Sequence, residues 1–327
     1  MTNAPPVLAI EHVTKDYRKG KRANDDITLH VEAGEVFGLL GHNGAGKTTL
    51  LNQVIGIAKP TSGTIHIDGQ DAVASPTMAR LACSMQPQTQ APLDGVTPRE
   101  AIELMARIRG ADRARAKRRT DELIEALDIG EWQDAKGERL SGGVQRLTAF
   151  AMAATEPGRL VMFDEPTNDV DPVRRRLLWA QVRNLADQGR AVLLVTHNVV
   201  EAERAVDRLA ILDNGKVIDQ GTPTQLRGEH TNQLRFEIVG ISNAAAAELA
   251  ERFAGAGPAV ITGRRVMVPI MADDCPAALR WAQDEQRAGL VDEFAFTPVS
   301  LEDIYIRLVG PEGSGTTEEV SNESLVA

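Results

Sequence analysis

Two hydrophobic patterns alternate along the chain between residues 7 and 221. Uninterrupted apolar runs at Val36–Leu40, Leu160–Phe163 and Ala191–Val195 are typical of strands that helices cover on both faces. Amphipathic stretches between these runs, among them Asp121–Leu127 and Arg174–Leu185, predict the covering helices. The pattern therefore predicts an α/β fold with a mainly parallel sheet as its core.

A different pattern appears at the start of the chain. Apolar and polar residues alternate in Leu8–Val13 and Ile27–Val31, which favours an antiparallel β flank beside the parallel core. The turn residues within Gly63–Gly69 and Asp213–Gly221 are typical of hairpins. We therefore expect part of the sheet structure to be antiparallel.

A polar break at Arg227–Asn232 precedes a second, smaller pattern. Its order of strand, helix, two strands, helix and strand predicts a small ferredoxin-like α+β domain, closed by one more helix. We expect one domain at 1–228, a second at 229–310 and a disordered acidic tail at 311–327. The expected elements of the second domain are strands Leu234–Val239, Ala259–Ile261, Arg264–Val268 and Val291–Phe296 and helices Asn243–Ala254, Pro276–Arg287 and Ser300–Leu308.

Composition narrows the classes of function. A chain of 327 residues has room for two domains, and its net charge of −10 argues against a nucleic-acid partner. The longest apolar run, Ala149–Ala154, is far too short to span a bilayer, and the first residues lack a secretory signal. Cys83 and Cys275 show neither metal-ligand spacing nor a disulfide framework. We expect a soluble, cytosolic protein whose membrane part, if it has one, is another chain.

A phosphate-binding loop is the first chemical motif. Gly41-His-Asn-Gly-Ala-Gly-Lys-Thr48 fits G-x-x-x-x-G-K-[ST] and lies between a predicted strand and the helical Thr49–Ile57. Backbone N–H groups and the helix N-terminus can hold phosphate oxygens, Lys47 can reach the β- and γ-phosphates, and Thr48 suits Mg²⁺. The loop predicts a bound nucleoside triphosphate. Its expected nucleotide-binding residues are Gly41, Asn43, Gly44, Ala45, Gly46, Lys47, Thr48 and Thr49.

Two carboxylates follow the buried run Leu160–Phe163. Asp164 at a strand exit can hold Mg²⁺, and Glu165 beside it can polarise a water that attacks the γ-phosphate. Lys47 completes the predicted catalytic set by its contact with that phosphate. A phosphate loop with an acidic strand also fits kinases and other NTPases, so a further motif is needed to choose between these classes.

Leu140-Ser-Gly-Gly-Val-Gln-Arg146 provides that motif, because it resembles the signature sequence of the ATP-binding cassette (ABC) family. A Ser cap followed by two glycines can open a helix toward an anion. In the ABC family that anion is the γ-phosphate held by the opposite subunit. The resemblance therefore implies that Ser141, Gly142 and Gly143 bind the nucleotide of a second chain.

Two more residues match family motifs that surround the nucleotide. Gln88 resembles the glutamine of the Q-loop, which senses Mg²⁺ and the γ-phosphate; Gln86 and Gln90 lie close, and Gln88 is preferred because it follows Pro87. Tyr17 resembles the aromatic residue that stacks on adenine. The resemblance thus assigns Gln88 to both the metal and the nucleotide, and Tyr17 to the base.

Two motifs follow the acidic pair. Asn168–Asp171 resembles the D-loop, and we prefer Asp171 over Asp169 as its nucleotide-binding residue because Asp169-Val170 departs from the usual small apolar pair. His197 follows a buried strand and resembles the switch histidine, which contacts the γ-phosphate and assists catalysis. With these two residues the set of family motifs is complete.

The resemblance implies the ATP- and Mg²⁺-dependent, hydrolysing subunit of an ABC transporter. Ser300–Tyr305 is similar to the end of the daunorubicin-resistance type of export ATPase, so we expect export of a drug, antibiotic or lipid-like molecule. The expected partners are an integral membrane permease and a second ATPase chain, with a homodimer favoured over a heterodimer. The chain is then expected at the inner face of the cell membrane, held there by the permease.

Two alternatives remain open at this stage. An importer ATPase would share the same motifs, and a soluble ABC protein could act on a ribosome or on DNA. The basic run Arg107–Arg119 could serve a nucleic-acid or lipid patch, although a solvated helical face is the simpler interpretation.

Overall fold

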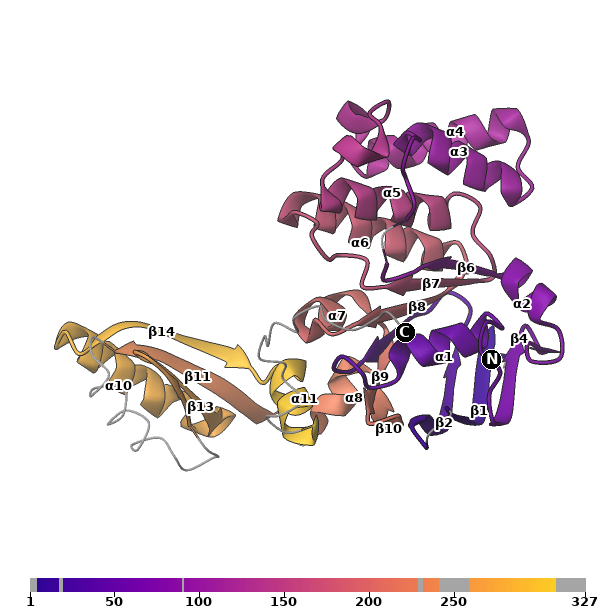
Figure 1. Cartoon of the computed structure of the whole chain (residues 1–327). Helices are drawn as coiled ribbons and strands as arrows, with labels where there is room; N and C mark the ends of the chain where they lie inside the picture. Colours follow the sequence, from indigo (N-terminus) through magenta and orange to yellow (C-terminus); the bar gives the residue numbers. More distant parts are fainter. Residues whose placement is uncertain (1–4, 18–19, 90, 229–231, 241–258, 310–327) are drawn as a thin grey trace, which may run out of the picture. The chain divides into compact units, whose positions relative to one another are not determined.

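The computed structural model of the protein describes residues 5–17, 20–89, 91–228, 232–240 and 259–309 (Figure 1). The chain forms two compact units, of which the first ends at Thr222 and the second spans Pro223–Leu308. The predicted helix Asn243–Ala254 and the predicted tail at 311–327 lie outside the described residues. In the described part of the chain no helix combines the length and the apolar character that crossing a bilayer requires.

A six-stranded sheet forms the centre of the first unit, with the strand order β10-β9-β3-β8-β7-β6. All neighbours from β9 to β6 pair in parallel, and only β10 is antiparallel. Every residue of β3, β7 and β8 is buried, which confirms the parallel core predicted from their unbroken apolar runs. The strands are β3 (Val36–Leu40), β6 (Cys83–Gln86), β7 (Leu160–Asp164), β8 (Ala191–Thr196), β9 (Arg208–Asp213) and β10 (Lys216–Gly221).

The predicted antiparallel flank is a separate four-stranded sheet with the order β2-β1-β4-β5. All three of its strand pairs are antiparallel. Both predicted hairpins are present: Asp68-Gly69 joins β4 to β5 and Asn214-Gly215 joins β9 to β10, each with two positive φ angles. The strands are β1 (Leu8–Asp16), β2 (Arg22–Val31), β4 (Ser62–Ile67) and β5 (Gln70–Asp71).

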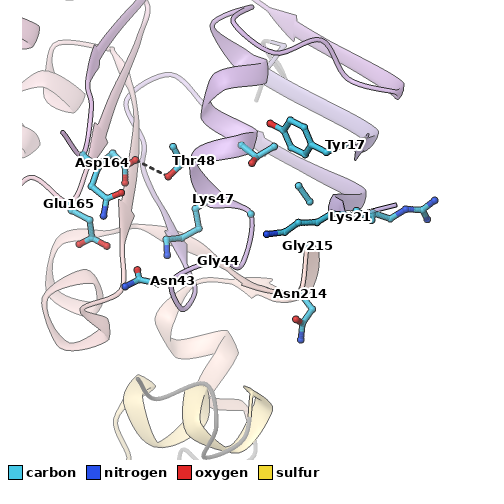
Figure 2. Close-up of a pocket in the computed structure, with 15 residues that line it drawn as sticks. Tyr17, Lys21, Asn43, Gly44, Lys47, Thr48, Asp164, Glu165, Asn214 and Gly215 are labelled. Carbon is cyan, nitrogen blue, oxygen red and sulfur yellow. Dashed lines mark hydrogen bonds between the residues drawn. The ribbon is translucent and has the colours of Figure 1, made fainter. Parts of the chain in front are cut away.

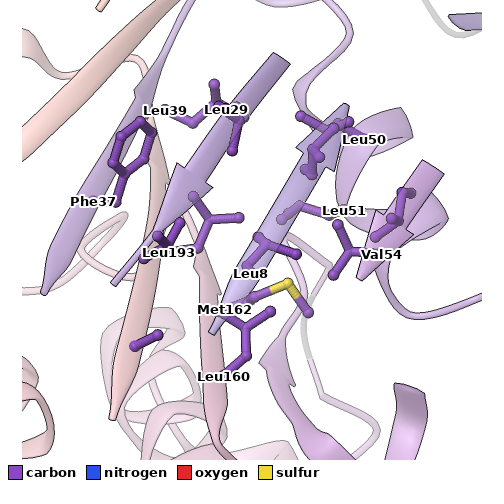
Figure 3. Packing of buried hydrophobic residues seen from close by; sticks show 14 of the residues in the cluster. Leu8, Leu29, Phe37, Leu39, Leu50, Leu51, Val54, Leu160, Met162 and Leu193 are labelled. Atoms are coloured by element: carbon purple, nitrogen blue, oxygen red, sulfur yellow. The ribbon is translucent and has the colours of Figure 1, made fainter. Parts of the chain in front are cut away.

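The core between the two sheets is built around helix α1 (Lys47–Val54). Leu50 and Leu51 of α1 are fully buried in one cluster with residues of β1, β3, β7 and β8 (Figure 3). On the other face of β7, Phe163 stacks on Phe150 of α5 (Gly142–Ala154), with ring centroids 4.6 Å apart. Helices therefore cover both faces of the parallel sheet, as its sequence pattern predicts.

A helical segment connects β6 to β7. Its first helix, α3, begins with a capping box, in which Thr97 accepts from the Glu100 backbone N–H and the Glu100 carboxylate accepts from the Thr97 N–H. One residue of the basic run Arg107–Arg119 has a structural contact: the Arg109 guanidinium donates a hydrogen bond to the Cys83 carbonyl (2.7 Å). The remaining elements of the first unit are α2 (Pro76–Ala82), α3 (Pro98–Ile108), α4 (Arg113–Ala126), η1 (Gly130–Trp132), η2 (Gly137–Arg139), α6 (Pro172–Asp187) and α7 (Val199–Ala205).

The second unit contains an antiparallel four-stranded sheet with the order β12-β13-β11-β14. This order places the first and third strands at the centre, as a ferredoxin-like fold requires, and the predicted strands are confirmed. Phe236 and Ile238 of β11 are fully buried in one cluster with Ala278 and Ala282 of α10. The elements are α8 (Pro223–Arg227), β11 (Gln233–Gly240), β12 (Val260–Thr262), β13 (Arg265–Met271), η5 (Ala272–Asp274), α10 (Cys275–Arg287), β14 (Val291–Pro298) and α11 (Leu301–Val309).

Candidate functional site

The loop between β3 and α1 has a backbone that only glycine can supply at several positions. Gly44 and Gly46 have φ angles of 90° and 108°, in the region that disfavours side chains. A Cβ at Gly46 would lie 2.2 Å from the Ala23 carbonyl oxygen, and one at Gly41 would lie 2.4 Å from that of Leu212. The loop is therefore packed between the start of β2 and the end of β9, with α1 beginning directly behind it.

A cavity of about 430 Å³ opens in front of this loop (Figure 2). Tyr17, on its wall, is 44% exposed and carries the Lys15 ammonium 5.1 Å from its ring centroid. Of the residues predicted from the sequence, the cavity is lined by Tyr17, Asn43, Gly44, Gly46, Lys47, Thr48, Thr49, Gln88, Asp164 and Glu165. The lining residues that sequence reasoning missed are Lys21, Arg22, Ala23, Asn214 and Gly215.

Lys47 is the first residue of α1 and is only 7% exposed. Its Nζ donates to the carbonyls of Gly41 (2.5 Å) and His42 (3.0 Å), so the loop's own backbone positions the ammonium. Burial lowers the pKa of Lys47, and the charges of Glu165 and Asp164 oppose this shift. The carboxylates therefore help to keep this buried lysine protonated.

Asp164, at the end of β7, is almost completely buried. The Thr48 hydroxyl donates to its Oδ2 at 3.2 Å, which joins the start of α1 to the acidic strand. Burial, and secondly the charge of Glu165, raise the pKa of Asp164 to about 6, while Thr48 and Lys47 act in the opposite direction. A hydroxyl and a carboxylate at this distance are oxygen ligands of the kind Mg²⁺ prefers.

These two side chains would leave most of a magnesium coordination sphere to phosphate oxygens and water. The described residues contain no cluster of three or more His, Cys, Asp or Glu side chains that could hold a metal without such help. This matches the usual behaviour of Mg²⁺, which binds through one or two carboxylates together with substrate phosphates. The residues present therefore fit a nucleotide-bound magnesium ion.

Glu165 directly follows β7 and is 2% exposed, with a positive φ of 52°. Its Oε1 accepts from the backbone N–H of His197 (2.8 Å) and from the ring Nδ1 of His197 (2.7 Å). The Thr196 hydroxyl donates to its Oε2 at 3.0 Å. The end of β8 thus fixes the orientation of the carboxylate, and Thr196 is a contact that the sequence motifs did not indicate.

Gln88 follows β6 and lines the cavity, whereas Gln86 is fully buried. The Gln86 Nε2 donates to the Arg146 carbonyl at 3.2 Å, so its side chain is engaged with helix α5. Arg146 in turn donates to the Gln88 carbonyl at 2.8 Å. Gln90 lies outside the described residues, and Gln88 is the glutamine that faces the cavity.

Several predicted residues do not line the cavity. Ser141 caps helix α5 and accepts from the Val144 N–H (3.4 Å), and Asp171 caps α6 by accepting from the Val173 N–H (3.0 Å). A Cβ at Gly143 would lie 2.5 Å from the Asp169 carbonyl oxygen, so the start of α5 packs on the loop before α6. The predicted residues outside the cavity lining are Gly41, Ala45, Ser141, Gly142, Gly143, Asp171 and His197.

Known sequences match this chain along nearly its whole length. The ABC transporter family profile matches residues 24–168. The daunorubicin/doxorubicin resistance ATP-binding protein of Streptomyces peucetius is 33% identical over 341 residues, which cover 99% of this chain and 100% of that protein. The Nod factor export ATP-binding protein I of Ralstonia nicotianae is 34% identical over 312 residues, with coverage of 94% and 95%.

A solved structure supports the same comparison at the level of the fold. It is a dimeric ATP-binding cassette in a post-hydrolysis state with ADP and phosphate bound. Its TM-score to this chain is 0.60 at 25% identity, and the match covers 66% of this chain and 98% of that one. The matched share is close to the extent of the first unit.

Proposed function

The chain belongs to the ATP-binding cassette (ABC) transporter family and is the ATP-hydrolysing subunit of an exporter, and we propose that the cavity between β3 and α1 is its catalytic site. One observation carries this assignment. The phosphate loop, Asp164 and Glu165 meet in a single cavity although 116 residues separate Thr48 from Asp164.

Nucleotide binding follows from the loop geometry. Backbone N–H groups of the glycine-rich loop and the N-terminus of α1 hold the phosphates, and Lys47 contacts the β- and γ-phosphates. Tyr17, exposed on the cavity wall, stacks on the adenine. Lys21 lines the same cavity and adds positive charge beside the ATP polyanion, whereas Arg22 pairs with Asp16 and Asp25 at 2.8 Å each.

Thr48 and Asp164 would hold Mg²⁺, with Gln88 approaching from the segment after β6. When bound there, the ion would neutralise charge on the β- and γ-phosphates. Thr48 and Asp164 already hydrogen-bond to each other, so both oxygens face the same point and need little rearrangement. Burial disfavours an isolated Asp164 carboxylate, and a cation offsets that penalty.

Glu165 acts as the general base that polarises the attacking water. The Thr196 hydroxyl holds one oxygen of the carboxylate and the His197 backbone N–H holds the other, and Glu165 lines the cavity. The His197 ring, more than half exposed, is available to contact the γ-phosphate from the same side. The reaction is hydrolysis of the bond between the γ-phosphorus and the β–γ bridging oxygen.

A second chain completes the site. Ser141, Gly142 and Gly143 form the start of α5 but lie outside this chain's own cavity, which supports their contact with the nucleotide of a partner. Asp171 caps α6, and Asp169 and Val170 just before it pack against the start of α5. We infer a head-to-tail homodimer with two shared ATP molecules, and the solved dimeric cassette supports this arrangement.

Export requires a membrane channel, which a separate permease would provide. ATP-driven closing and opening of the dimer would change the conformation of that permease. The similar proteins are named for resistance to daunorubicin and doxorubicin and for export of Nod factor, which supports export of a small drug-like or lipid-like molecule over import. We place the chain in the cytoplasm, bound to the inner face of the cell membrane through the permease.

The variant Glu165→Gln tests this site. It should keep ATP affinity within about twofold but lower the ATPase rate by about a hundredfold or more, because only the general base is lost. ATP should then trap a dimer, which size-exclusion chromatography with light scattering would detect. Glu131→Gln, an exposed glutamate of η1, is the matched control. Turnover at the wild-type rate by Glu165→Gln would refute the catalytic assignment.

A further inference from the structure

The turn between β9 and β10 packs tightly against the phosphate loop. The Leu212 carbonyl leaves no room for a Cβ at Gly41, and the Gly215 N–H donates to the Ala45 carbonyl at 3.0 Å. Asn214 and Gly215 also line the nucleotide cavity. The β9–β10 turn therefore packs against one side of the phosphate loop, although it lies about 170 residues later in the sequence.

His42, inside the phosphate loop, joins the loop to that turn by its side chain. Its Nε2 contacts the Asp213 Oδ1 at 2.9 Å, and its Nδ1 contacts the Asn43 carbonyl oxygen at 2.7 Å. The Asp213 carboxylate oxygen can only accept, so the Nε2–H of His42 donates in this contact. A hydrogen bond to a carboxylate is charge-assisted, and such bonds are the strong ones.

The backbone of His42 also contacts Lys47: the His42 carbonyl accepts a hydrogen bond from the Lys47 Nζ at 3.0 Å. A shift of His42 would therefore displace the lysine that contacts the phosphates. The Asp213 carboxylate is itself held, since its Oδ2 accepts from the Asn214 side chain at 2.9 Å. The side chains of His42 and Asp213 do not line the cavity, so any effect they have on the nucleotide is indirect.

We propose that His42 and Asp213 are a positioning pair, which fixes the phosphate loop and Lys47 in nucleotide-binding geometry by fastening them to the β9–β10 turn. The pair raises the affinity for ATP rather than the rate of the chemical step, because it preorganises the groups that bind ATP. This role rests on the proposed function, since it presupposes that the cavity binds ATP.

Equilibrium binding of a fluorescent ATP analogue with Mg²⁺ to the full chain tests the pair. His42→Ala and Asp213→Ala should each raise the dissociation constant by about tenfold, the range expected for one charge-assisted hydrogen bond. The double variant should be no weaker than either single variant, because both remove the same contact. Asp213→Asn keeps an acceptor oxygen without the charge and should lie between wild type and Asp213→Ala. In ATPase assays the loss should appear in KM, with kcat reduced by less than about twofold.

The exposed pair His12–Asp26, joined at 2.8 Å on the β1–β2 sheet, supplies the matched control His12→Ala, which should bind as wild type does. Melting temperatures of all variants separate lost folding from lost binding. Unchanged dissociation constants in His42→Ala and in both Asp213 variants, with ATP binding by wild type, would overturn the positioning pair. Failure of wild type to bind ATP would instead overturn the proposed function.

Discussion

At the scale of single residues, two adjacent carboxylates are buried side by side, where the protein by itself stabilises them poorly. Asp164 and Glu165 are both nearly inaccessible to solvent, and burial together with their mutual repulsion raises the pKa of Asp164 to about 6. Lys47 and the Thr48 hydroxyl offset this only in part. A buried carboxylate pair of this kind is typical of a functional site, and the proposed ligand here is the metal-bound nucleotide.

Asp164 makes stability depend on pH in a direction opposite to that of most carboxylates. Its pKa is about 6 in the fold against an ordinary value of 3.8, so between these values the folded chain binds more protons and becomes less stable as pH rises. Asp164→Asn should therefore raise the free energy of unfolding by about 2 kcal/mol at pH 7.5, and by little at pH 4. Urea titrations of nucleotide-free protein would measure this, with the exposed Asp94→Asn as control. A less stable Asp164→Asn at pH 7.5 would contradict the buried-charge penalty.

At the scale of elements, two hydrogen bonds join the signature helix α5 to the end of β6 and to the segment that follows it. Gln86 donates to the Arg146 carbonyl, and the buried Arg146 guanidinium donates to the Gln88 carbonyl. The position of the Gln88 backbone therefore depends on the position of α5. Because α5 also carries the residues proposed to meet the partner's nucleotide, this contact joins the proposed dimer interface to Gln88 in the cavity lining.

Removing that tie should impair catalysis more than ATP binding. Arg146→Met leaves the Gln88 carbonyl without its donor and should lower kcat by about tenfold, because Gln88 is no longer held against the cavity. Arg146→Lys keeps a donor and should retain more activity. Steady-state ATPase kinetics and melting temperatures would be compared with Arg139→Met, an exposed arginine of η2. Wild-type kcat in a folded Arg146→Met would show that the tie has no catalytic role.

At the scale of the whole molecule, the proposed machinery is divided between two copies. One copy brings the phosphate loop and the acidic pair to a cavity, while Ser141–Gly143 at the start of α5 lie outside it. In the proposed homodimer the two complementary surfaces close on each other as a symmetric pair. Activity would then depend on protein concentration.

Mixing two inactive variants tests this division directly. Lys47→Ala disables the phosphate loop and Ser141→Arg blocks the start of α5, so each homodimer should be inactive. In an equimolar mixture, half of the dimers carry one intact composite site, which predicts recovery of about a quarter of wild-type ATPase activity. The measurement is ATPase rate against mixing ratio, with wild type diluted into buffer as the reference. No recovery in a mixture shown to form mixed dimers would contradict shared sites.

Much of this protein is determined by local sequence. The loop Gly41–Thr48, the acidic pair and the runs that form β3, β7 and β8 could be identified because each is a contiguous segment whose residue types dictate its backbone. The parallel core, the antiparallel flank, both hairpins and the strands of the second unit followed from the same patterns.

Contacts between distant segments were decided only by the tertiary structure. Three such features depend on which strands lie beside β3 and β7. They are the cavity wall formed by Lys21, Asn214 and Gly215, the hydrogen bond from Thr196 to Glu165 and the pair His42–Asp213. No local pattern records such proximity, because the strand order of a sheet is set by long-range packing rather than by neighbouring residues. The sequence by itself therefore determined which groups are proposed to perform the chemistry, and the fold decided which groups hold them in place.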